Sequence, residues 1–184
     1  MKLYFILFFL SSAVFAQETP AKSFWNQLQQ HCGKSYEGTI SQGIGNDNFD
    51  GKTLIMHVRS CEENEIRIPF FVGENRSRTW ILRLQDSKIQ LKHDHRKPDG
   101  REDKITQYGG TASNIGLANI QVFPADEETA ELIPAAATNV WWITLDKEIF
   151  SYNLKRIGSK GNFTVEFNLS KPLNTPEAPW GWEE

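Results

Sequence analysis

The sequence lacks the residues and motifs that identify many functional classes. Of its 184 residues, only 2 are Cys, 8 are Pro and 13 are Gly, which excludes disulfide-rich scaffolds, collagen-like chains and low-complexity chains. There is no Gly-x-Ser-x-Gly, phosphate-binding glycine loop, Cys-x-x-Cys or His-Glu-x-x-His motif. The net charge of −3 gives no electrostatic reason to bind nucleic acid, so we expect no nucleic-acid partner.

Only one long apolar run is present, and it lies at the start of the chain. Lys2 precedes the apolar run Leu3–Leu10, and the small residues Ala13 and Ala16 fit a signal-peptidase site. The run is shorter than the roughly 20 residues that span a bilayer. We therefore expect a signal peptide over 1–16 and a single mature domain over 17–184. The mature chain would be periplasmic or extracellular and would carry no transmembrane anchor.

The two cysteines agree with export. Cys32 and Cys61 are the only pair available, and an oxidising compartment favours a disulfide between them. Closing a loop of about 30 residues contributes roughly 3–4 kcal/mol to stability in the chain-entropy model.

Aromatic residues are abundant, with 12 Phe, 6 Trp and 4 Tyr, although the mean hydropathy is −0.48. The rings alternate with polar residues in short segments separated by turn residues, which is typical of strands with one buried face. Short gaps join antiparallel neighbours, and an antiparallel meander closes most simply into a barrel. The sequence therefore predicts an all-β barrel, an antiparallel meander of about 8–10 strands. The predicted strands are 35–41, 53–61, 65–72, 78–85, 88–96, 104–108, 117–123, 139–145, 150–157 and 162–169.

Three further local features are expected. Ser23 would cap a short helix over Phe24–His31, and Asp126 would cap another over Glu127–Ile133. Pro69 cannot donate a ladder hydrogen bond, so its strand is expected at an edge or with a bulge. Trp180 and Trp182, in the C-terminal segment, would either fill one end of the barrel or pack on its wall.

Two resemblances follow from local motifs. The N-terminal helix leading into Gly33-Lys34-Ser35-Tyr36-Glu37-Gly38 resembles the opening of lipocalin-like (calycin) barrels, with Tyr36 where that pattern has Trp. This resemblance implies a barrel closed at one end by a short helix. The segments 56–59, 67–70 and 92–96 are similar to uncharacterised exported bacterial proteins, a group that implies no particular activity.

The most pronounced candidate site is His93-Asp94-His95. Residues two apart in a strand share a face, so both imidazoles point the same way. Hairpin pairing places an acid opposite His95, either Glu102 or Asp103. The second register is preferred because it also sets Arg96 against Glu102 and Asp94 against Lys104. Two imidazoles and a carboxylate can hold zinc, copper or iron, and His57 is a further candidate ligand. The alternative is a polar rim with cross-strand salt bridges.

The arginines of the early strands provide a second candidate. Arg78 shares a face with Trp80, Leu82 and Leu84, so its guanidinium is expected at the barrel mouth. There it would bind a ligand carboxylate or phosphate, or else pair internally with Glu65 or Glu74. We expect an exported protein that binds a small, partly apolar ligand through Arg78, Trp80, His57, His93 and His95. The alternatives are a secreted enzyme with a divalent metal on His93, His95 and Asp103, and a non-catalytic envelope interaction protein.

Overall fold

The structure, a computed structural model, describes residues 18–43, 49 and 51–182. The predicted signal peptide over 1–16 lies outside these residues. The elements in chain order are α1 (Pro20–Gln29), β1 (Ser35–Gln42), β2 (Leu54–His57), β3 (Ser60–Cys61), β4 (Glu65–Val72), β5 (Asn75–Gln85), β6 (Lys88–His95), β7 (Tyr108–Thr111), β8 (Ile120–Pro124), α2 (Glu127–Leu132), a 3-10 turn (Pro134–Ala136), β9 (Asn139–Leu145), β10 (Ile149–Arg156) and β11 (Asn162–Leu173).

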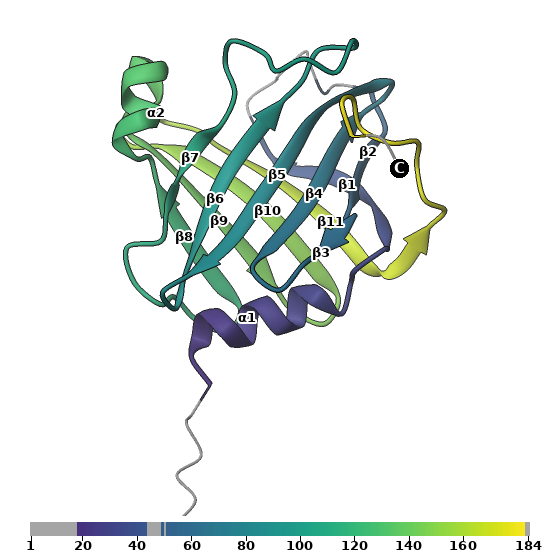
Figure 1. Ribbon diagram of the computed structural model, residues 1–184, viewed down its shortest axis with the longest axis horizontal. Coiled ribbons are helices and arrows are strands. Elements are labelled where there is room, and N and C mark those ends of the chain that lie inside the picture. Colours follow the sequence, from purple (N-terminus) through teal and green to yellow (C-terminus); the bar gives the residue numbers. More distant parts are fainter. Residues whose placement is uncertain (1–17, 44–48, 50, 183–184) are drawn as a thin grey trace, which may run out of the picture.

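The strands form one antiparallel sheet that curls into a barrel (Figure 1). The hydrogen-bonded order is β7-β6-β5-β4-β2-β1-β11-β10-β9-β8, and β3 also pairs with β4. Two pairings in this order do not join neighbours in the chain. That of β4 with β2 passes over the short β3, and that of β1 with β11 brings the first and last strands together. The predicted all-β meander that closes into a barrel is confirmed.

One seam of the barrel is closed without a strand ladder. β7 and β8 lie at the two ends of the sheet and are bridged through α2. The Gly109 amide donates to the Thr129 hydroxyl at 2.7 Å, and the Gly109 carbonyl accepts from the Asp126 amide at 3.0 Å. The backbones approach so closely that a side chain at Gly110 would place its Cβ 1.8 Å from the Pro124 carbonyl oxygen. Glycine is therefore required there because no other residue fits the seam.

Helix α1 covers one end of the barrel (Figure 1). Its apolar side chains Phe24, Trp25 and Leu28 are fully buried in the core together with inward residues of the strands. The helix begins earlier than predicted. Thr19, not Ser23, is the N-cap and accepts a hydrogen bond from the Lys22 amide, with Pro20 in the first turn, a position that proline favours.

The predicted disulfide between Cys32 and Cys61 is present and joins the segment after α1 to β3. The predicted strand 53–61 is interrupted after His57 and resumes at Ser60. Pro69 lies opposite this interruption, which removes the need for its missing N–H on that side. Its strand is therefore not at an edge, and the bulge lies beyond it, between Phe70 and Val72.

The segment that precedes β7 and the start of α2 test two further predictions of local structure. The predicted strand 104–108 is wrong except for its last residue: after the isolated Arg96–Glu102 bridge the returning chain pairs with β6 again only in β7, from Tyr108 onward. The Asp126 cap of α2 is confirmed, since its side chain accepts from the Thr129 amide.

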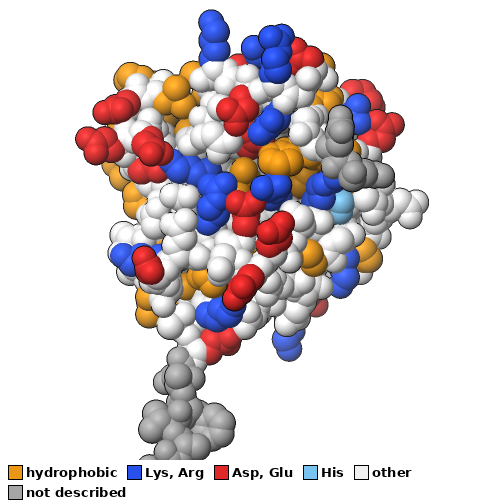
Figure 2. All heavy atoms as spheres, in the orientation of Figure 1, with side chains coloured by type: hydrophobic (Ala, Val, Ile, Leu, Met, Phe, Trp, Pro, Cys, Tyr) orange, Lys and Arg blue, Asp and Glu red, His pale blue; other side chains and the backbone are white. Residues whose placement is uncertain are grey.

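The C-terminal segment packs on the outer wall. Trp182 lies between the guanidinium groups of Arg67 and Arg96, at 4.2 and 4.8 Å from the ring centroid, and its Nε1 donates to Asp94. The indole thus fastens the C-terminal segment to β4 and β6 through cation–π contacts and a hydrogen bond. Figure 2 shows basic and acidic side chains intermixed on this face. Within the described residues, no helix is long and apolar enough to cross a membrane.

The disulfide provides a stability prediction. Replacing both cysteines by Ala should lower the free energy of unfolding by about 3–4 kcal/mol, because the unfolded chain regains the entropy of a loop with a sequence separation of 29 residues. Urea unfolding of the two proteins, each with intact far-UV circular dichroism, measures the difference. An unchanged midpoint would contradict the prediction, as would labelling of both thiols in the unreduced, denatured wild type.

Candidate functional site

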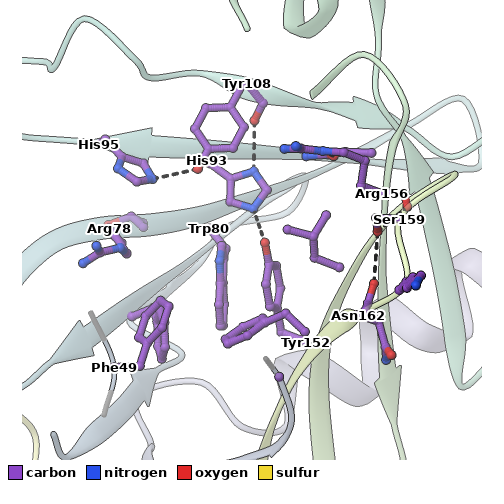
Figure 3. Close-up of a pocket in the computed structure, with 18 residues that line it drawn as sticks. Phe49, Arg78, Trp80, His93, His95, Tyr108, Tyr152, Arg156, Ser159 and Asn162 are labelled. Atoms are coloured by element: carbon purple, nitrogen blue, oxygen red, sulfur yellow. Dashed lines mark hydrogen bonds between the residues drawn. The ribbon is translucent and has the colours of Figure 1, made fainter. Parts of the chain in front are cut away.

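The barrel contains a cavity of about 520 Å³ in the half away from α1 (Figure 3). The cavity lies among the ends of β4, β5, β6, β9, β10 and β11 together with Phe49 and the turn after β10. Its lining residues are Gly43, Phe49, Phe70, Arg78, Thr79, Trp80, His93, His95, Tyr108, Asn139, Tyr152, Leu154, Arg156, Ser159, Lys160, Gly161, Asn162 and Phe163.

Three parallel rings separate the cavity from the packed half of the barrel. Trp80 stacks on Tyr152 with centroids 4.3 Å apart and on Phe70 with centroids 5.0 Å apart. Both neighbours lie within 15° of parallel to the indole, so they compete with any ligand for its faces. Phe150 and Phe167 continue the aromatic packing toward the core. A ligand would therefore meet mainly the edges of this stack.

His93 lies on the cavity wall in a single tautomer. Its Nδ1 is 3.0 Å from the Tyr108 carbonyl oxygen, which only accepts, so Nδ1 carries the proton. Nε2 then accepts from the Tyr152 hydroxyl at 2.7 Å (Figure 3). Burial lowers the pKa of His93 to about 3, so the ring is neutral at pH 7. Its ring also stacks on Tyr108, with centroids 4.6 Å apart.

His95 faces the same cavity nearer its mouth. Its Nε2 is 3.1 Å from the Tyr108 hydroxyl. Burial, and then the charge of Arg78, lower the pKa of His95 to about 4, while burial raises the pKa of Tyr108 to about 12. Both histidines and Tyr108 are therefore uncharged at pH 7.

Arg78 is the cationic group that lies beside these neutral residues. It opposes His95 across the β5–β6 ladder, and its guanidinium lies 5.8 Å from the centre of the Phe49 ring. Nη1 donates to the Asn75 and Ser77 side-chain oxygens at 3.1 and 3.5 Å. Burial lowers the pKa of Arg78, and with it the stability of its charged form. Neither of the predicted internal ion pairs, with Glu65 or Glu74, is formed: Glu65 pairs instead with Arg67 and Arg83.

The other predicted site residues are not all brought together. Arg78, Trp80, His93 and His95 line the cavity, whereas His57 does not. His57 follows the inward-facing Met56 and is buried against the Gly33 backbone on the outer side of the sheet.

The hairpin after β6 has the register that sets Asp103 opposite His95, but the predicted metal ligands are not grouped there. Arg96 pairs with Glu102, and the Asp103 amide donates to the His95 carbonyl. The Asp103 carboxylate is exposed and accepts from the Lys104 amide. The predicted pairing of Asp94 with Lys104 is wrong. The Asp94 carboxylate is buried on the outer wall, where it accepts hydrogen bonds from Arg96, Thr106 and Gln107. Among the described residues, no three His, Cys, Asp or Glu side chains are grouped to hold a metal.

Sequence reasoning missed several cavity residues. Tyr152 is two residues from both Phe150 and Leu154 in a correctly predicted strand, so strand alternation was a sufficient signal for its inward position. Tyr108 ends the predicted strand 104–108 but begins β7, where it pairs with His93 and contacts both histidines. Arg156 is two residues beyond Leu154 in the same strand, so the same alternation is a sufficient signal for its inward position. Phe49 lies outside the strands and carries no comparable signal.

Comparisons with known proteins identify no relative: no family model, no curated protein and no solved structure matches the chain.

The buried histidines predict how stability depends on pH. Their folded-state pKa values, about 3 and about 4, lie below the ordinary 6.5, so the unfolded chain binds protons first as the pH falls. The free energy of unfolding should therefore decrease below about pH 6.5, with each histidine contributing about 1.4 kcal/mol per pH unit.

Replacing His93 by Gln should make this dependence shallower by about 1.4 kcal/mol per pH unit between pH 4.5 and 6. Urea unfolding at a series of pH values measures the slope, which is independent of any uniform loss of stability in the variant. His31 and His57, whose pKa values are also lowered by burial, remain in both proteins. An unchanged slope would show that His93 is charged in the folded protein.

Proposed function

We propose that this chain is an exported binding protein that takes up a small, partly apolar ligand in its barrel cavity. The observation that carries the proposal is the cavity itself. Its volume of about 520 Å³ falls within the range of roughly 300–1,000 Å³ that is usual for small-molecule sites. Aromatic rings form much of its wall, and a few polar groups converge on it.

The distribution of packing supports binding rather than a purely structural barrel. Around α1 the interior is filled by fully buried side chains such as Trp25, Met56 and Leu82. Beyond the Trp80 stack the side chains leave a cavity, and the residues there include Arg78, His93 and Asn139. Polar groups at such positions cost stability unless they are hydrogen-bonded, and are typical of sites that orient a ligand.

Export is supported by two independent features. The first is the apolar segment with its small-residue cleavage pattern at 1–16. The second is the Cys32–Cys61 disulfide, which persists in oxidising compartments.

Native mass spectrometry and metal analysis of the protein purified from its own host test the proposal. We expect an organic adduct. A stoichiometric metal that is lost in a His93→Ala/His95→Ala variant would instead favour the metal-dependent enzyme. A protein with neither adduct nor metal, and with a filled interior in a crystal structure, would favour the interaction protein.

A cavity-filling variant locates the ligand. Leu154→Trp adds a large side chain to the cavity wall and should weaken binding of the neutral apolar dye N-phenyl-1-naphthylamine by at least about tenfold, the loss of roughly 1.4 kcal/mol. Val122→Trp is the matched control, because Val122 is 40% exposed on β8 and does not line the cavity. Dye fluorescence measures the affinity. Equal binding by both variants would place the dye outside the cavity and contradict the proposal.

A further inference from the structure

The charged residues around the cavity are of one sign. Three of its lining residues, Arg78, Arg156 and Lys160, are basic, and none is acidic. This contrasts with the chain as a whole, in which 23 acidic residues outnumber 20 basic ones. Among the described residues that line the cavity, positive charge is therefore concentrated without a compensating carboxylate.

The arginines elsewhere on the barrel behave differently. Five of them form ion pairs with carboxylates, namely Arg67, Arg76, Arg83, Arg96 and Arg101. Arg78 and Arg156, which line the cavity, form no ion pair with any described residue. Arg156 instead donates from Nε to the Asn139 side-chain oxygen at 3.2 Å. Among the described residues, carboxylates are thus absent from the cavity lining but pair with arginines elsewhere on the barrel.

Arg78 has a hydrogen-bonding edge available for a ligand. Only its Nη1 is engaged, by Asn75 and Ser77. Its Nε and Nη2 make no hydrogen bond to a described residue, and these two groups form the edge of a guanidinium that can hold both oxygens of a carboxylate. The group is half-buried, so an unpaired charge there is unfavourable and a bound anion would relieve the cost.

Among the described lining residues, no polar group carries a negative charge that could hold a cationic ligand. His93 has both nitrogens engaged, by Tyr108 and Tyr152, and His95 contacts the Tyr108 hydroxyl. Below them lie the edges of the stacked rings Phe70, Trp80 and Tyr152. The site thus combines a cationic group near the mouth with an apolar floor.

We propose that the ligand is an amphiphilic carboxylic acid, with its carboxylate on the Nε–Nη2 edge of Arg78 and its apolar part along the aromatic wall. Arg156 and Lys160 add positive potential around the entrance and attract the anion. This inference rests on the proposed binding function and specifies the chemical class of the ligand. A cationic ligand is disfavoured, since it would meet three like charges and no acid among the described lining residues.

Displacement of N-phenyl-1-naphthylamine by three ligands of equal chain length tests the inference. Decanoate, decan-1-ol and decylammonium differ in the headgroup, and dye fluorescence at pH 7.5 gives their apparent affinities. Decanoate should bind about 10- to 100-fold more tightly than decan-1-ol, as expected for a charge-assisted hydrogen-bonded pair. Decylammonium should bind most weakly.

Three variants assign the headgroup contact. Arg78→Met should remove most of the preference for decanoate over decan-1-ol, leaving only the contribution of Arg156 and Lys160, while the dye still binds, which shows that the cavity is intact. Arg78→Lys should keep part of the preference, because it retains the charge but not the two-pronged edge. Arg83→Met is the matched control: it removes the same charge from the same strand, at a position that pairs with Glu65 outside the cavity, and should keep the full preference.

The contrary outcomes are distinct. Equal displacement by all three ligands would overturn the inference and leave the binding function standing. A decanoate preference of unchanged size in Arg78→Met would also overturn it, since the anion would then be held elsewhere. Failure of the dye to bind saturably, together with failure of all three ligands to bind in calorimetry, would overturn both the inference and the proposed function.

Discussion

The pairing of β5 with β6 is the constraint on which the cavity depends. Its register sets Arg78 opposite His95 and Trp80 opposite His93, so one face of this ladder supplies the cation, both imidazoles and the central indole of the site. Side chains alternate along a strand, and a slip of either strand by one residue would turn its two site residues to the outer wall. A slip of β6 would turn inward the ion-paired Asp94, which now bonds to Trp182 and Arg96. The buried partners on both faces therefore hold the register.

The same ladder explains why the interior is divided. Below Trp80, its inward residues are aliphatic and pack with α1 into a filled core. Above Trp80 they are Arg78, His93 and His95, whose polar groups are satisfied from the side by Tyr108 and Tyr152 or left facing the cavity. Burial keeps both histidines neutral. The charge presented to a ligand therefore comes from arginine and lysine and not from the histidines.

The sequence predicts the strand positions that form the barrel wall better than the loop positions at its rim. Regular alternation of apolar and polar residues predicted β4 and β9 and the inward positions of Arg78, Trp80, His93 and His95. The disulfide was predicted from the oxidising compartment that an exported protein reaches. The segment 104–108 misled because it contains strand-forming residues, yet tertiary contacts of Asp94 with Thr106 and Gln107 hold it outside the ladder. Phe49 lies outside the strands and reaches the site through loop geometry, which a single sequence does not encode in any local pattern. A metal held by His93, His95 and Asp103 is an alternative that the sequence allows, and it stays a prediction.

A crystal structure of the mature protein grown with decanoate tests the central claim most directly. We predict one molecule in the cavity, with both carboxylate oxygens within hydrogen-bond distance of Arg78 Nε and Nη2 and the chain directed toward Trp80 and Tyr152. A decanoate bound only on the outer surface, or one in the cavity with its carboxylate turned away from Arg78, would contradict the account.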